Sequence, residues 1–289
     1  MDQIVIDVIG TLNAASSLFL ASAGVTLIFG AMRVINMAHG SFYMFGAFIM
    51  ASLVGFATSS RFWWAIPVAA LAVAALGAVV EAGVIRRIYG KEHLTQLLAT
   101  FALVLIFADA ALWIWGSEYR TVAIPDFFLA GIDIFGTTVP KYNVMIIGTA
   151  VAVGVGLWLL LRFTLVGWKI RAAVDDPESL EASGINLKRL FTVVFALGAL
   201  LAGLGGAVVS PQIAVTPGID HSIIVFAFIV TVVGGLGSVL GAAVGALLIG
   251  AAETLGTQFA PEWASVFPYL AMILILAIRP WGLFGVDER

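Results

Sequence analysis

The sequence predicts an all-α polytopic membrane protein, and its composition, its hydropathy and its long apolar segments all indicate this fold class. Apolar residues make up 62% of the 289 positions and charged residues only 11%. A soluble domain has about 25% charged residues and roughly 45–50% apolar residues with glycine included. The mean hydropathy is +1.10. A chain of this size cannot bury so much apolar surface in water. The composition therefore excludes a soluble enzyme, a nucleic-acid-binding protein and a disordered chain.

The apolar segments predict about 8–9 transmembrane helices within one transmembrane domain, residues 1–289. A spanning helix requires roughly 20 mostly apolar residues. Because Gly234-Gly235-Leu236-Gly237-Ser238 interrupts the last third of the pattern, we expect a glycine-broken helix pair near residues 234–238. The N-terminus lacks the basic region of a cleavable signal peptide, so we expect the first segment to be retained. The expected spans lie near residues 8–32, 38–58, 62–85, 94–115, 143–161, 190–209, 222–233, 239–252 and 264–278.

The basic residues predict the orientation of the chain. Cytoplasmic loops of membrane proteins carry an excess of Lys and Arg. If the loop at about 162–190 is cytosolic and the loop at about 117–142 is external, eleven basic residues lie inside and three lie outside. This assignment gives an N-out and C-in chain, and it favours nine crossings over eight, with one of the nine short or re-entrant. The three outside residues are Arg61, Arg120 and Lys141.

The chain lacks the residue patterns of an enzyme or a cofactor site. It has no cysteine, and its three histidines do not have the spacing of metal ligands. No glycine-rich phosphate-binding sequence and no clustered carboxylates are present. Of the few acids in apolar segments, Asp109 and Glu253 stand alone, and Glu81 is close enough in sequence to pair with Arg86. We expect no catalytic residue, metal or cofactor.

Polar side chains within the apolar segments are candidates to line a path for a polar solute. Asn36 and His39 lie where the first two spans meet, on one face at a spacing of three residues. They fit a turn in which both side chains cap open helix ends, and they also fit a broken helix beside such a path. Hydroxyl and amide groups on other spans extend the set. The candidates are Asn13, Ser17, Asn36, His39, Thr95 and Thr100.

A stripe of small residues follows the glycine break. Gly237, Gly241 and Gly245 repeat at a spacing of four, which lets helix backbones approach closely in a membrane. The stripe is compatible with packing inside the chain and with an interface to a second membrane subunit.

The loop between the fifth and sixth spans contains a predicted short helix. Asp176-Pro177 has the sequence of a helix start, and Gly184 has that of a helix stop. Basic residues flank this helix on both sides, and Leu180 lies among its acids. A connecting loop needs no capped helix, so we expect this one to dock on a partner. The alternative is a solvated acidic loop.

Three ordered motifs give the chain a resemblance to a known family. They are Ile35-Asn36-Met37-Ala38-His39-Gly40, the run from Arg171 through Asp176-Pro177 to Gly184-Ile185-Asn186, and Gly234-Gly235-Leu236-Gly237-Ser238 with Gly241 and Gly245. Over nearly its whole length the chain resembles the membrane permeases of bacterial ABC importers of the branched-chain amino acid type, in particular the smaller of the two paired permeases.

The resemblance implies a multi-subunit machine in the bacterial inner membrane. It implies a second homologous permease, two ABC ATPase subunits that hydrolyse ATP, a periplasmic substrate-binding protein, and no nucleic acid. It also implies a coupling helix that contacts an ATPase through Asp176, Pro177, Glu178, Leu180, Glu181 and Gly184.

The solute remains open at this point, because the family also includes importers of urea, short amides and other small organic solutes. A solitary ion-coupled secondary carrier, a passive channel and a membrane-embedded enzyme are the competing classes.

Overall fold

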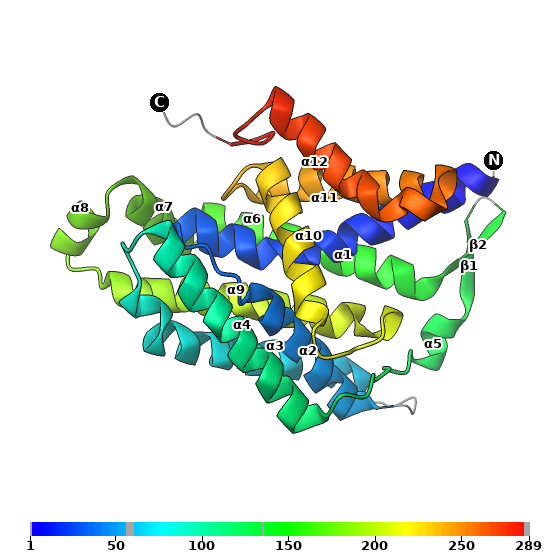
Figure 1. The fold of residues 1–289 in the computed structure, drawn as a ribbon, viewed down its shortest axis with the longest axis horizontal. Coiled ribbons are helices and arrows are strands. Elements are labelled where there is room, and N and C mark those ends of the chain that lie inside the picture. The colour runs from blue at the N-terminus through cyan, green and yellow to red at the C-terminus, as the bar shows by residue number, and fades with distance from the viewer. Residues whose placement is uncertain (1, 56–60, 135, 286–289) are drawn as a thin grey trace.

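The computed structural model describes residues 2–55, 61–134 and 136–285. The longest helices run along the long axis of the molecule (Figure 1). Helix α8 (Pro177–Ala182) projects at one end, called here the α8 end. The N-terminus lies at the opposite end, beside a hairpin of strands β1 (Gly131–Ile134) and β2 (Thr137–Pro140), called here the hairpin end.

Nine helices occupy the positions of the expected spans in the described residues. They are α1 (Asp2–Met32), α2 (His39–Val54), α3 (Phe62–Gly83), α4 (His93–Trp115), α6 (Lys141–Phe163), α9 (Leu187–Val209), α10 (Ile219–Gly234), α11 (Val239–Phe259) and α12 (Phe267–Ile278). The connections contain short helices. These are α5 (Asp126–Leu129), α7 (Leu165–Asp175), and the 3₁₀ turns η1 (Ile85–Arg87), η2 (Ser210–Gln212) and η3 (Pro261–Val266).

The expected number of eight or nine crossings is not confirmed. Seven helices in the described residues are long and apolar enough to cross a membrane. Helices α2 and α10 have only 16 residues each, or about 24 Å at a rise of 1.5 Å per residue. This is shorter than a hydrocarbon core of about 30 Å. The expected spans at 38–58 and 222–233 are therefore short helices. Hydropathy alone does not distinguish a short apolar helix from one that crosses the membrane.

The two long connections are more ordered than the sequence predicts. The segment 117–142 contains α5 and the antiparallel hairpin, in which Ile132 pairs with Val139, so the fold is not purely α. The segment 162–190 contains an additional helix, α7, before the expected short one. Helix α7 places Ile170 and Ala173 in the core.

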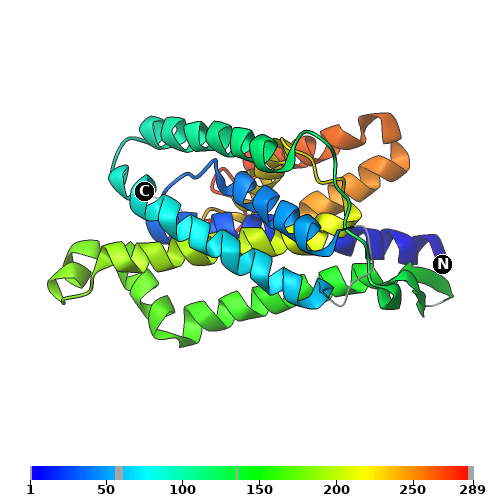
Figure 2. The same cartoon turned by 90° about the horizontal axis from the view of Figure 1, so that it is seen from below.

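Helix α9 is the most buried of the long helices and packs against α1, α2 and α3. Glycines make this close packing possible. A side chain at Gly46 of α2 would collide with the backbone of Gly203, and one at Gly206 would collide with the carbonyl oxygen of Tyr43. Helices α4 and α6 lie on opposite sides of the bundle (Figure 2).

Glu81 pairs with Arg86, as its position in the sequence suggests. Its buried carboxylate accepts hydrogen bonds from Arg86 Nη2 at 2.9 Å, from the Thr192 hydroxyl at 2.6 Å and from the Tyr89 hydroxyl at 2.5 Å. These contacts join α3, η1 and α9. A carboxylate with so many donors is stable away from water, so Glu81 has a structural explanation.

Candidate functional site

The chain leaves helical structure between α1 and α2. Helix α1 ends at Met32, and Arg33 has a φ of 51°, in the left-handed region. Residues 33–38 then run without regular structure until α2 begins at His39. A side chain at Gly24, in the middle of α1, would collide with the His39 ring and with the carbonyl oxygen of Gly198 of α9. The start of α2 therefore lies inside the bundle, and regular helical structure is interrupted between Met32 and His39.

Helix α4 satisfies the polar backbone of this interruption. The Ile35 N–H donates to Gln96 Oε1 at 3.3 Å, and the Met37 N–H donates to the Thr100 hydroxyl at 3.2 Å. Asn36 Oδ1 accepts from the Ala38 N–H at 3.1 Å. Irregular backbone at membrane depth requires partners from the protein. Asn36 and Thr100, both candidate path residues, therefore hold the break in place.

A second interruption meets the first inside the bundle. Helix α10 begins at Ile219 after Gly218, whose φ is 95°. The Ser41 hydroxyl, in the first turn of α2, donates to Asp220 Oδ2 at 2.8 Å. A side chain at Gly40 would collide with the carbonyl oxygen of Asp220. The N-terminal turns of α2 and α10 thus converge, and the carboxylate of Asp220 lies where both helix dipoles are positive.

Several polar atoms at this convergence have no partner within the described chain. They are Asn36 Nδ2, Asp220 Oδ1 and both ring nitrogens of His39. All three residues are at most 4% exposed. Thr26 and Thr231 share a buried hydroxyl contact of 3.3 Å between α1 and α10. Because unpaired buried polar groups are costly, this polar centre differs from the surrounding apolar core.

The remaining candidate path residues do not join this centre. Asn13 Nδ2 donates to Gln212 Oε1 at 3.2 Å, and Gln212 Nε2 donates to Asn143 Oδ1 at 2.8 Å. This amide chain links α1, η2 and α6. The Ser17 hydroxyl bonds the carbonyl oxygen of Asn13 in its own helix. Thr95 lies exposed in the first turn of α4.

The predicted glycine break separates α10 from α11. Gly235 and Gly237 have φ values of 100° and 85°, and Ser238 caps α11 by accepting from the Gly241 N–H at 3.0 Å. A side chain at Gly237 would collide with Gly30 of α1, whereas one at Gly241 or Gly245 would collide with the backbone of α10. The stripe of small residues therefore packs helices together inside this chain.

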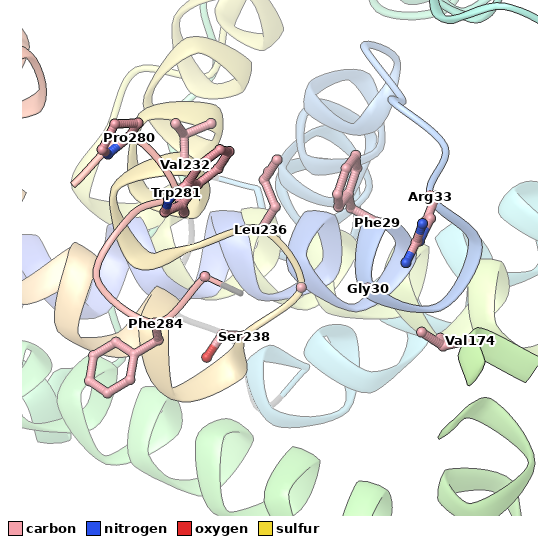
Figure 3. A pocket seen from close by; sticks show the side chains of 12 residues that line it. Phe29, Gly30, Arg33, Val174, Val232, Leu236, Ser238, Pro280, Trp281 and Phe284 are labelled. Atoms are coloured by element: carbon pink, nitrogen blue, oxygen red, sulfur yellow. The ribbon is translucent and has the colours of Figure 1, made fainter. Parts of the chain in front are cut away.

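A cavity of about 460 Å³ lies beside this break and meets several elements at once (Figure 3). Its lining includes Arg33 from the end of α1, Val174 from α7 and Leu236 from the glycine break. The C-terminal segment contributes Trp281 and Phe284. This segment also bonds the end of α10, because the N–H groups of Leu283 and Phe284 donate to Val233 O and Gly234 O. The cavity thus joins both helix breaks to α7.

Helix α8 has the caps that the sequence predicts. The Asp176 carboxylate accepts from the Ser179 N–H at 3.0 Å, and Pro177 is the first helical residue. Hydrogen bonds from Ser179 hold the pKa of Asp176 below its usual range. A carboxyl group with a lowered pKa stabilises the folded state above its unfolded-state pKa, and this contribution is lost only as the pH falls through the lowered value. The cap is therefore intact at neutral pH.

The C-terminal end of α8 is a left-handed turn. Gly184 has a φ of 82°, and the Ile185 N–H returns to the carbonyl oxygen of Leu180. None of the α8 residues is buried, although Leu180 packs partly against the core. Glu178 and Glu181 are exposed. The structure thus presents a capped and exposed helix at the α8 end.

These features define a class of protein. A bundle of apolar helices with two interrupted helices converging at its centre has the architecture of a polytopic membrane transport protein. Comparison with known families makes the assignment specific. Residues 8–276 match the model of the branched-chain amino acid transport system / permease component family. The chain belongs to this family and is a multi-pass inner-membrane permease.

The chain is similar to several branched-chain amino acid permeases. It is 28% identical to the high-affinity branched-chain amino acid transport system permease protein BraD of Pseudomonas aeruginosa, with 96% of this chain and 94% of BraD covered. It is also 28% identical to the LivH permeases of Salmonella typhimurium and Escherichia coli K12, with 94% of this chain and 92% of each relative covered. No solved structure matches the chain.

The polar centre contains residues that the sequence did not single out. Ser41 and Asp220 are 179 residues apart, and no local pattern pairs them. Gln212, which accepts from Asn13, and Asn143, which accepts from Gln212, were missed for the same reason. One signal for Asp220 was available, because an acid that follows Pro217-Gly218 and precedes an apolar run is typical of a helix N-terminus.

Proposed function

We propose that this chain is one permease of an ATP-driven importer of branched-chain or related amino acids. The membership of the family and the names of its relatives support this solute class. The further subunits of the proposed importer are a second homologous permease, two ABC ATPases and a periplasmic substrate-binding protein. The chain would sit N-out and C-in, so that the α8 end is cytosolic.

The observation that carries the proposal is the exposed helix α8. It projects beyond the bundle (Figure 1), it is capped at both ends, and its acids are exposed. A loop that only connects α7 to α9 does not need a capped helix. We assign to it the contact with an ATPase subunit, made through Asp176, Pro177, Glu178, Leu180, Glu181 and Gly184.

Helix α7 offers a route from α8 to the interrupted helices. It leads directly into α8, and its Val174 lines the cavity beside Arg33 and Leu236 (Figure 3). Movement of α8 would displace α7 against both breaks at once. Because the short helices α2 and α10 depend on these breaks, they are the elements expected to shift during alternating access.

The hairpin end is the proposed docking face for the substrate-binding protein. There the external loop pairs with the loop after α9 through two backbone hydrogen bonds of 2.9 Å between Arg120 and Val215. Amide and hydroxyl groups together with helix N-termini can receive a zwitterionic amino acid without a fixed counter-charge.

A pair of glycines permits a matched test of the contact. Gly184 and Gly90 both have positive φ, 82° and 68°, and a Cβ at either meets no atom within 4 Å. Valine at either position therefore introduces similar backbone strain, but only Gly184 borders α8. In the complete importer we expect Gly184→Val to lower amino acid uptake per ATP hydrolysed at least tenfold, and Gly90→Val to leave the ratio near wild type. Equal ratios in the two variants would count against the assignment.

A further inference from the structure

Helix α4 presents an exposed face that has no covering element in the described chain. It packs chiefly against α2, and only a minority of its residues are buried. Exposed side chains recur along it at helical spacing: Leu98, Ala102, Leu105, Asp109 and Leu112. Such a stripe forms one continuous face, on the side of the bundle opposite α6 (Figure 2).

Asp109 makes this face unlike a surface that contacts lipid. The residue is exposed, and its carboxylate has no hydrogen-bond or ion-pair partner in the described part of the chain. Its neighbours Leu105, Ile106 and Trp113 are 51%, 59% and 89% exposed. Asp109 lies six residues before the end of α4, or about 9 Å along the axis. A short carboxylate at that depth, surrounded by apolar side chains, is unfavourable in lipid.

The physical options for this carboxylate are few. Acids within spans normally face a protein interior or a water-filled cavity and find a partner there. The small residue Ala102, two turns before Asp109, would let another helix approach closely. The flanking leucines suit packing against apolar side chains and do not suit a polar channel wall.

We propose that this face of α4 is the surface on which the second permease packs, with Asp109 opposite a hydrogen-bond donor or a cationic side chain of that subunit. The inference rests on the proposed function, because it assumes a second permease in the assembly. The charge specifies the partner's chemistry, since a helix that brings Lys, Arg, Ser or Asn to this depth complements Asp109. The apolar flanks require the rest of that helix to be apolar.

Site-specific photo-crosslinking tests the location of the interface. A benzophenone amino acid is placed at Leu105 in the complete, ATPase-containing importer, and a matched probe is placed at Val151 on α6, which is 59% exposed. We expect Leu105 to crosslink to the second permease and Val151 to yield no subunit adduct. If the Leu105 variant does not assemble, Leu98 on the same face, which is 62% exposed, provides a second position.

Several outcomes would overturn the proposal. They are an intact importer in which neither position on α4 crosslinks, adducts from Val151 alone, and an adduct of this chain with its own copy. Because the chain has no cysteine, Ala102→Cys gives a clean second readout. Labelling of this variant by a polar maleimide in the assembled importer would place water at the face and would also overturn the proposal. An assembly without ATPases would instead contradict the proposed function.

Substitution of Asp109 distinguishes an interface from a lipid-facing position. Leucine would suit lipid at least as well as aspartate, so a lipid-facing site predicts normal recovery of the second permease with Asp109→Leu. At the proposed interface, Asp109→Leu lowers recovery of the second permease at least tenfold, whereas Asp109→Asn, which keeps an acceptor, lowers it less. Membrane insertion of this chain, measured separately, is expected to stay normal in both variants. Normal recovery with Asp109→Leu would contradict the proposal.

Discussion

The hydroxyl of Ser41 donates a hydrogen bond of 2.8 Å to the carboxylate of Asp220, and this bond joins the first turns of two short helices inside the bundle. One helix follows an irregular segment from the α8 end, and the other follows a loop from the hairpin end. The bond therefore fixes the point at which two interrupted helices meet. Its contribution to stability can be measured directly.

Ser41→Ala is expected to lower the free energy of unfolding by about 1–3 kcal/mol, because it leaves a buried carboxylate oxygen without its donor. The measurement is the thermal unfolding of the purified chain in detergent. Ser222→Ala is the control, since the Ser222 hydroxyl is exposed and bonds only the carbonyl oxygen of Ile219 in its own helix. If the Ser41 and Ser222 variants unfold at the same temperature, the bond does not hold α2 and α10 together.

Thr100→Val is expected to destabilise the chain by a similar amount, about 1–3 kcal/mol, because the Met37 N–H would lose its acceptor in an apolar setting. Thr149→Val on α6 removes a hydroxyl that bonds only the carbonyl oxygen of Met145 in its own helix. The measurements are the thermal unfolding of the two variants and their cleavage by protease near residues 33–38. Greater sensitivity of the Thr149 variant at this segment would contradict the role given to α4.

Gly241→Ala is expected to cost roughly 1–3 kcal/mol, because the added Cβ would collide with the backbone of Gly234 and force α10 and α11 apart. Gly148→Ala on α6 meets no atom within 4 Å, so it should be neutral or stabilising by about 0.5–1 kcal/mol through better helix propensity. The comparison of their melting temperatures is the measurement. A Gly241 variant as stable as the Gly148 variant would show that close packing at the break is dispensable.

Glu81→Gln is expected to lower the free energy of unfolding by about 1.5–3 kcal/mol, the range for hydrogen bonds to charged groups, because Arg86 loses its ionic partner. Glu92→Gln, at an exposed position before α4, is the control. If chemical denaturation shows the same midpoint for both variants, the cluster that joins α3, η1 and α9 contributes little to the stability of the fold.

The features predicted correctly from the sequence are those with local physical causes. Asp176, Pro177 and Gly184 act within a few residues of one another, so their sequence specifies the helix they cap. Length and hydropathy place the long helices for the same reason. Helix α2 begins at His39, close to the predicted start of its span, but ends at Val54, before the predicted end. The partners of the irregular segment before it, Gln96 and Thr100, lie more than 60 residues away and could not be predicted. The pairing of Ser41 with Asp220 is likewise tertiary.

Candidate solute-path residues were harder to assign, because a polar side chain in an apolar helix has several uses. Asn36 and Thr100 satisfy backbone groups, and Asn13 belongs to an amide chain. Only the hydrogen-bond partners seen in the structure distinguish these structural uses from a position that lines a solute path. His39 keeps both ring nitrogens without partners in the described chain, so it remains the candidate most worth testing by substitution.

Amino acid uptake into proteoliposomes tests the central proposal most directly. The chain is reconstituted alone, and also with a second permease, two ATPases and the binding protein, each with and without ATP on the ATPase side. Uptake of branched-chain amino acids is expected only from the complete assembly and only with ATP. Saturable uptake by the chain alone, without ATP or any other subunit, would contradict the account.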